Sequence, residues 1–368
     1  MTNESGPALH ANRLHVQNAL LARPDFRATG RGRRGAIQLR AARIGHLELI
    51  GSVLTNDSGP ALLADRIRIE GAFFTHSGLI ASGTGESGAI QLTGAHIGML
   101  GMEETTLTNQ SGPALRAEVL EVDGDAWVGD KLTASGNADE GAIILRGAKI
   151  GGRLDLAHAS ISNPTGLLVD LSRATATALL FTADRICPAR QDNTTSCPHE
   201  EQRIGVTGFV CTTLLGITWR EWLHLLRRHT TDYAPSPYQQ LAGIERAAGH
   251  DGNARLVLIT QQQDLHARGQ AGGRLTRAVH TIWGMLAGYG YRARRTAMAL
   301  VIALLLAGML GLWAGHWVST PGHHAAERTT QTGDPPGTPC SPVEQFGLGI
   351  DRGLPLALPG SAPSAIST

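Results

Sequence analysis

The chain repeats itself at a fixed interval of 53 residues, and this repeat limits the available folds more than any other feature. Three motifs keep the interval: Ser-Gly-Pro-Ala-Leu at 5–9, 58–62 and 111–115, Gly-Ala-Ile at 35–37, 88–90 and 141–143, and Ala-x-Ile-Gly at 42–45, 95–98 and 148–151. A fourth, weaker copy begins at Asn163, one residue late. Repeats that hold their register in this way are typical of solenoid proteins.

Short apolar segments inside each copy predict the secondary structure. In the third copy they lie at Leu115, Val122, Val128 and Leu132, with Gly, Asp, Asn or Ser between them. Segments this short indicate strands rather than helices. We therefore expect a mainly β fold, a parallel β-helix over residues 1–215 whose rungs stack on one another. Three rungs of roughly 18–22 residues are the simplest content of one repeat, and two longer rungs with an insertion are the alternative.

The composition agrees with a narrow solenoid. Glycine accounts for 46 of the 368 residues, aromatic residues for 4% and charged residues for 17%. A tube filled with small aliphatic side chains needs few aromatic rings, and glycine suits its corners. The 32 basic and 31 acidic residues give a net charge of +1, so nucleic acid is not an expected partner.

Two glycine-rich strings, 30–35 and 83–88, match the dinucleotide-binding pattern G-x-G-x-x-G. That pattern binds a cofactor between a strand and a helix whose N-terminus faces the pyrophosphate. Here each string precedes the short segment Ala-Ile-Gln-Leu at the same phase of the repeat. We interpret both strings as corners of the solenoid, and we expect no cofactor and no catalytic residue.

One cluster contains residue types that bind metals: Cys187, Cys197, His199 and Cys211. Its spacing lacks the Cys-x-x-Cys knuckle of zinc sites, and the prolines beside two of its members predict loops. The favoured interpretation is an irregular cap over the last rung, with these four residues as weak metal candidates.

After residue 215 the apolar residues take helical spacing. Thr218 and Glu221 form a predicted capping box, and Ser236-Pro237 is a second helix start. A further helix over about 253–266 completes a predicted αα-hairpin region at 216–272. We expect its core at Tyr238, Leu241, Ile244, Leu256 and Ile259.

Residues 297–318 contain no charged side chain and predict a transmembrane helix, because these 22 positions extend about 33 Å. The juxtamembrane segment 273–296 is basic, so the positive-inside rule predicts a single-pass cell-membrane protein with a cytoplasmic solenoid. Residues 319–368 predict a low-complexity, largely disordered tail. Predicted contacts with membrane lipid are Arg274, Arg277, Trp283, Tyr289, Tyr291, Arg292, Arg294 and Arg295.

Several motifs together carry a resemblance to a known family. They are the 53-residue unit, the segment 233–241, the pairs Gly249-His250 and Ala254-Arg255, and the segment 288–292. In these motifs the chain resembles actinobacterial membrane-associated proteins with pentapeptide-like β-helix repeats. Some members of that family are named membrane-associated oxidoreductase, and no catalytic residue is carried over from them.

These observations favour one function over its alternatives. The leading hypothesis is a membrane-tethered, non-catalytic scaffold whose solenoid binds a protein partner or a second copy of itself. The alternative is a membrane-associated oxidoreductase, which the resemblance implies and which requires an unrecognised flavin or nicotinamide site. A rod that mimics nucleic acid by its charge is a third hypothesis, and the neutral balance of the repeats disfavours it.

Overall fold

The computed structural model describes residues 1–75, 77–183, 186, 202–268, 293–317 and 341–353. The chain divides into two compact units, Met1–Arg268 and Gly269–Thr368. Each unit is described by itself below.

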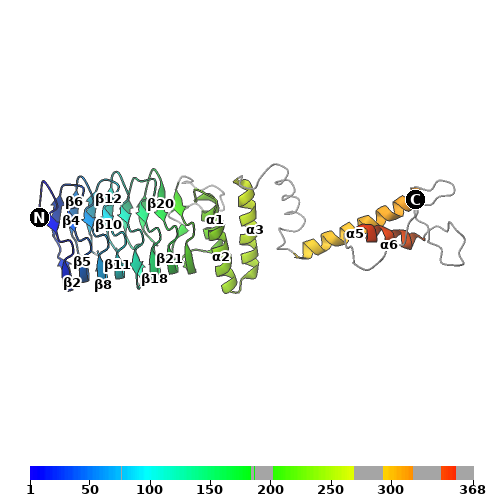
Figure 1. Ribbon diagram of the computed structural model, residues 1–368, viewed down its shortest axis with the longest axis horizontal. Coiled ribbons are helices and arrows are strands. Elements are labelled where there is room, and N and C mark those ends of the chain that lie inside the picture. Colours follow the sequence, from blue (N-terminus) through cyan, green and yellow to red (C-terminus); the bar gives the residue numbers. More distant parts are fainter. Residues whose placement is uncertain (76, 184–185, 187–201, 269–292, 318–340, 354–368) are drawn as a thin grey trace. The chain divides into compact units, whose positions relative to one another are not determined.

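The first unit is a parallel β-solenoid, which confirms the predicted fold class (Figure 1). In its described residues the strands form three parallel sheets. The first sheet contains β1 (Leu9–His10), β4 (Ile37–Gln38), β7 (Leu62–Leu63), β10 (Ile90–Gln91), β13 (Leu115–Arg116), β17 (Ile143–Ile144), β20 (Leu167–Asp170) and β22 (Arg203–Gly205). The second contains β2 (His15–Ala22), β5 (Arg43–Leu49), β8 (Arg68–Phe74), β11 (His96–Gly101), β14 (Glu121–Val122), β15 (Ala126–Trp127), β18 (Lys149–Asp155), β21 (Thr175–Leu180) and β23 (Val210–Leu215). The third contains β3 (Arg27–Gly30), β6 (Val53–Asn56), β9 (Ile80–Gly83), β12 (Thr106–Asn109), β16 (Thr133–Ser135) and β19 (Ser160–Ser162).

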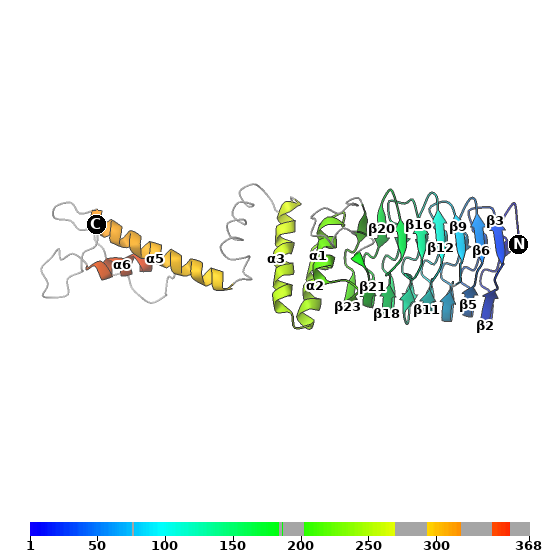
Figure 2. The ribbon, with the colours of Figure 1, turned by 180° about the vertical axis from the view of Figure 1, so that it is seen from behind.

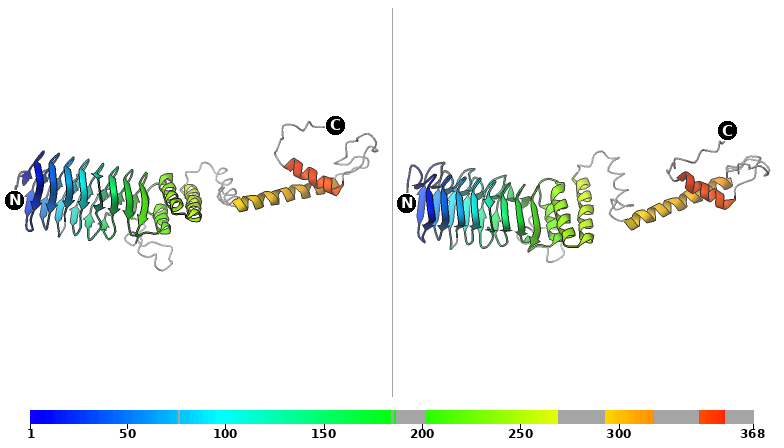
Figure 3. Two further views of the ribbon diagram at one scale, coloured as in Figure 1. Left: turned by 90° about the horizontal axis from the view of Figure 1, so that it is seen from below. Right: turned by 60° about the horizontal axis from the view of Figure 1, so that its bottom comes forward.

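The chain visits the three sheets in turn, and one such circuit is a coil. Figures 2 and 3 show the coils stacked along one axis from other directions. In the first sheet Leu9 pairs with Ile37, which pairs with Leu62, so successive coils are 28 and then 25 residues long. One 53-residue repeat is therefore two coils, so the favoured expectation of three rungs is wrong and the alternative of two longer rungs holds. The coils are longer than predicted because strands of the second sheet reach 7 or 8 residues.

The two coils of a repeat differ because neighbouring coils must complement each other. In the third sheet, glycine and asparagine alternate at one position, as at Gly83 and Asn109. A Cβ atom at Gly83 would lie 2.9 Å from the Gly59 carbonyl oxygen and 3.1 Å from the Ala89 Cα. Two residues earlier in each strand, a buried position alternates between alanine and leucine. Its members are Ala28, Leu54, Ala81, Leu107 and Ala134.

The asparagine side chain links two coils and explains the recurring Asn-x-Ser-Gly-Pro string. The Asn109 amide nitrogen donates hydrogen bonds to the carbonyl oxygens of Gly85 and Pro113, at 2.9 Å each. Its amide oxygen accepts one from the Ser111 backbone N–H at 3.1 Å. Asn56 makes the equivalent bonds one repeat earlier, and both side chains are buried.

Three helices follow β23: α1 (Trp219–Arg228), α2 (Pro235–Ala247) and α3 (Asp251–Ala267). The predicted capping box of Thr218 and Glu221 is present at the start of α1. Tyr238 and Leu241 are buried as predicted, but Leu256 is exposed, so that part of the predicted core is wrong. The buried face of α3 instead contains Ala254, Val257, Leu258, Gln261 and Asp264.

These helices close one end of the solenoid. The backbone at His229, after α1, continues the first sheet because the Ile204 N–H donates to the His229 carbonyl oxygen at 2.7 Å. In α2, the side chain of Gln240 donates to the carbonyl oxygen of Cys211 in β23. The strands β22 and β23 show that residues 203–215, including Cys211, belong to a regular coil, whereas residues 187–201 of the predicted irregular cap lie outside the described residues.

The second unit contains α5 (Ala293–Trp317) and α6 (Pro342–Gly353), packed closely together. A Cβ atom at Gly308 would overlap the Phe346 ring, and one at Gly349 would overlap the Ala307 carbonyl oxygen. Within the described part of the chain, no helix combines the length and apolar character needed to cross a membrane. The helix α6 lies inside the segment 319–368 predicted to be a tail, and the remainder of that segment, apart from Ser341, lies outside the described residues.

The asparagine link gives a first prediction. We expect Asn109→Ala to lower the free energy of unfolding by about 2–4 kcal/mol, because the carbonyl oxygens of Gly85 and Pro113 and the N–H of Ser111 each lose a hydrogen bond. Chemical denaturation of the full chain, followed by circular dichroism, measures the change.

The neighbouring Gln110→Ala is the matched control, since that side chain is exposed. It should shift the unfolding free energy by less than about 0.5 kcal/mol. Equal losses in the two variants would contradict the proposed role of Asn109.

Candidate functional site

The two G-x-G-x-x-G strings form corners of the solenoid. The string 83–88 lies between β9 and β10, and no helix follows it. Its central glycine, Gly85, has φ +86°, and the equivalent Gly32 has φ +116°. These are left-handed conformations that side chains with a Cβ resist. The interpretation as corners is therefore confirmed, and the strand–turn–helix of a dinucleotide site is not formed there.

The backbone groups of these corners already have partners. The Gly85 N–H donates to the Ser111 hydroxyl at 2.7 Å, and its carbonyl oxygen accepts the Asn109 amide at 2.9 Å. Gly32 makes the same two contacts with Ser58 and Asn56. The N–H that a phosphate-binding loop would offer to its ligand is thus used to join two coils.

The structure describes only one of the four predicted metal candidates, Cys211. Cys187, Cys197 and His199 lie outside the described residues. Cys211 lies in β23 and points into the core, and burial raises the pKa of its thiol to about 11. A buried thiol in this environment is protonated at neutral pH. No group of three or more His, Cys, Asp or Glu in the described residues is placed to hold a metal.

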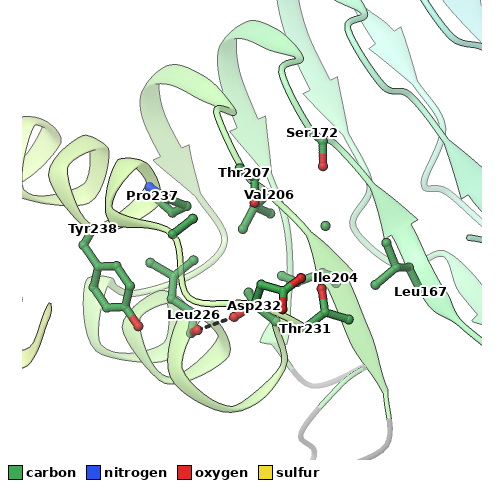
Figure 4. Close-up of a pocket in the computed structure, with 13 residues that line it drawn as sticks. Leu167, Ser172, Ile204, Val206, Thr207, Leu226, Thr231, Asp232, Pro237 and Tyr238 are labelled. Carbon is green, nitrogen blue, oxygen red and sulfur yellow. Dashed lines mark hydrogen bonds between the residues drawn. The ribbon is translucent and has the colours of Figure 1, made fainter. Parts of the chain in front are cut away.

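A cavity of about 190 Å³ lies where the last coils meet α1 and α2 (Figure 4). It is smaller than the roughly 300–1,000 Å³ of common small-molecule sites. Its polar groups include Ser172, Thr207 and Asp232. Its apolar lining comes from Leu167, Ile204, Val206, Leu226, Pro237 and Tyr238.

A buried polar network beside this cavity holds the three helices together. The Tyr238 hydroxyl donates to the Asp264 carboxylate at 2.7 Å, and the Arg268 Nε lies 3.0 Å from the same oxygen. The Arg268 guanidinium also donates to the carbonyl oxygens of Leu226 and Arg227 at the end of α1. Burial, with the Asp264 carboxylate, raises the pKa of Tyr238. A tyrosine that stays protonated and already donates its proton is a structural group here rather than a general base.

Sequence reasoning missed this network because the helical core was traced through apolar and tyrosine positions alone. One signal was available: the two lie four residues apart and form an i, i+4 ion pair at the end of a helix.

The predicted membrane-interface residues fall mostly outside the described chain. Arg294 and Arg295 lie in the first turn of α5. The other six lie outside the described residues: Arg274, Arg277, Trp283, Tyr289, Tyr291 and Arg292. The predicted lipid contacts therefore stay predictions.

Comparison with protein-family models, with curated proteins and with solved structures gives no match to the chain. The resemblance drawn from the sequence motifs therefore stays a prediction. Function has to be argued from the chain's own residues.

The corner glycines give a second prediction. We expect Gly85→Val to lower the free energy of unfolding by about 1–3 kcal/mol, because valine resists the left-handed conformation. No atom lies within 4 Å of an added Cβ there, so the loss reports backbone strain rather than a clash. Gly85→Asn is the control, since asparagine tolerates this conformation and should cost less. Calorimetric binding of NAD or FAD to the unaltered protein, lost in Gly85→Val, would contradict the structural role.

The helical network gives a third prediction. A raised pKa means that Tyr238 contributes stability below its ordinary pKa of about 10, and that this contribution is lost as the pH rises above it. We expect the unfolding free energy to fall above about pH 10, and Tyr238→Phe to remove part of that slope. Tyr233→Phe is the matched control, because the Tyr233 hydroxyl accepts a bond from Gln261 and should leave the slope intact. Unfolding measured from about pH 8 to about pH 11, a range that brackets the ordinary tyrosine pKa of about 10, decides between them.

Proposed function

We propose that this protein is a non-catalytic scaffold whose solenoid presents an extended surface to a protein partner or to a second copy, and which is tethered to the cell membrane with the solenoid in the cytoplasm. The observation that carries the proposal is the register of the coils. Equivalent outward positions form continuous columns along the solenoid, such as His15, Arg43, Arg68, His96, Glu121 and Lys149. Columns of this kind suit binding along a face rather than in a deep pocket.

The backbone of the solenoid supports a rigid presenting surface. Successive coils are joined by backbone hydrogen bonds of the parallel sheets, and alternate junctions also carry a buried asparagine link. A surface held in this way changes little on binding, so less ordering entropy opposes the association. The proposal assigns no catalytic step to the chain.

Membrane attachment is proposed from α5. Its described apolar side chains include several that are more than half exposed: Met298, Leu300, Leu306, Met309, Leu310 and Trp313. A contiguous exposed apolar surface indicates contact with a membrane or a partner. The crossing of the bilayer is a prediction from the charge-free run at 297–318, and the cytoplasmic solenoid is a prediction from the arginines before it.

Cysteine labelling in intact cells tests the tether and its orientation. A membrane-impermeant maleimide should modify Cys340, which follows the predicted span, and spare Cys187, which precedes it. Permeabilised cells are the control and should allow both to react. Modification of Cys187 alone would reverse the orientation, and modification of both in intact cells would contradict the tether.

The same purified protein tests the non-catalytic role. A scaffold without a bound redox group should show no absorption band between about 350 and 500 nm. A flavin or reduced-nicotinamide band that copurifies with the chain would favour the oxidoreductase instead.

A further inference from the structure

We propose that an arginine-lined groove near the beginning of the solenoid binds a compact anion that carries more than one phosphoryl group. The groove lies at the first corner, which we define as the turn between the first and second sheets. It has a volume of about 450 Å³ and is lined by Asn12, Arg13, Arg40, Ala41, Asp65 and Arg66. This site does not depend on the proposed scaffold role.

Three successive coils bring the arginines together. The Arg13 N–H donates to the Arg40 carbonyl oxygen, and the Ala41 N–H donates to the Asp65 carbonyl oxygen, at 2.8 and 2.9 Å. Residues 12–13, 40–41 and 65–66 are therefore equivalent positions of neighbouring coils, which lie about 4.8 Å apart. Two more arginines, Arg43 and Arg68, pair directly in the second sheet just beyond the corner.

The guanidinium groups that line the groove are exposed and available to a ligand. Among the described residues, Arg13, Arg40 and Arg66 have no carboxylate within 4.0 Å. The nearest acidic side chain is that of Asp65, whose oxygens accept bonds from the Gln91 side chain and the Thr93 N–H at 3.1 and 3.2 Å. The one carboxylate of the groove is thus hydrogen-bonded to the next coil, and it also interacts electrostatically with Arg40 and Arg66, which leaves the groove with a net positive charge.

Several basic residues at or beside the same corner farther along the solenoid are paired instead. Arg116 lies 3.2 Å from Glu118, and Arg146 lies 2.8 Å from Asp170. Lys149 lies 2.8 Å from Glu121. Arg173, at this corner near the end of the solenoid, forms none of the ion pairs found in the described residues, so what distinguishes the first coils is the gathering of several such arginines in one groove.

The net charge of the chain also changes sign between the first coils and the following ones. Residues 1–83 contain ten arginines and six acidic residues, a net charge of +4. Residues 84–164 contain five basic and eleven acidic residues, a net charge of −6. An anion near the solenoid is therefore attracted to its first coils and repelled by the following ones.

The chemistry of the groove favours phosphoryl groups. Arginine binds phosphate oxygens through two parallel N–H bonds, and several arginines close together suit a ligand with several such groups. The volume is that of a small-molecule site, within the roughly 300–1,000 Å³ of such pockets. A free polyphosphate and a phosphorylated lipid headgroup share this chemistry.

The corner conformation supplies variants that remove charge without damaging the fold. Arg13 and Arg66 have φ +59° and +54°, and glycine occupies the equivalent place in other coils, at Gly94 and Gly147. Replacing either arginine by glycine therefore relieves backbone strain. Arg173 has the same conformation, φ +59°, but lies four coils beyond Arg66.

Calorimetric titration of the full chain in neutral detergent with tripolyphosphate tests the site. We expect saturable binding that weakens with salt, and a loss of affinity of at least about tenfold in Arg66→Gly, Arg13→Gly and Arg40→Gln. The unfolding temperature of the two glycine variants should stay the same or rise, which excludes misfolding as the cause. Arg173→Gly is the matched control and should change the affinity by less than about twofold.

A second arm distinguishes the source of the phosphoryl groups. Mixed micelles doped with a bisphosphorylated inositol lipid replace tripolyphosphate, with undoped micelles as the blank. Binding in this arm alone, lost in Arg66→Gly, assigns the groove to a lipid headgroup. The proposal is overturned by absence of binding in both arms, by an equal loss in Arg173→Gly, or by binding of a polyglutamate peptide in place of tripolyphosphate.

Discussion

Backbone hydrogen bonding between successive coils is the constraint on which the rest of this structure depends. Each strand must find a parallel neighbour about 4.8 Å away on both sides, so each side chain faces the equivalent side chain of the next coil. The buried column Ile37, Leu62, Ile90, Leu115 and Ile143 follows from this requirement. The requirement extends to the helices, because His229 and Gln240 supply the partners that β22 and β23 need at the end of the stack.

The predictions from sequence succeeded where a motif requires a particular local backbone geometry. The repeat identified a parallel solenoid, the Thr218–Glu221 capping box marked the start of α1, and the glycine strings marked corners. The number of coils per repeat was missed because equivalent positions in neighbouring coils do not look alike: glycine at 83 faces asparagine at 109. A search for identical residues therefore detects every second coil.

The polar features of the molecule were harder to predict. In α3 the apolar spacing pointed to Leu256, but the helix buries Gln261 and Asp264, which satisfy their polar groups through Tyr233 and through Tyr238 and Arg268. The arginine groove was missed for another reason. The meeting of Arg13, Arg40 and Arg66 in one groove can be predicted only when the coil length is known, and no local spacing in the sequence gives that length.

The alternation of the two coil types also restricts how a solenoid of this kind can change its length. Loss of one coil of 25 or 28 residues would change the pairing in the third sheet. Glycine against glycine would leave carbonyl groups without their asparagine donor, and asparagine against asparagine would crowd the junction. Loss of a full 53-residue unit keeps the phase, because the junction it creates is one that the chain already contains. The solenoid can therefore change its length only in pairs of coils, and duplication of the gene segment for one pair lengthens the solenoid without a new kind of contact.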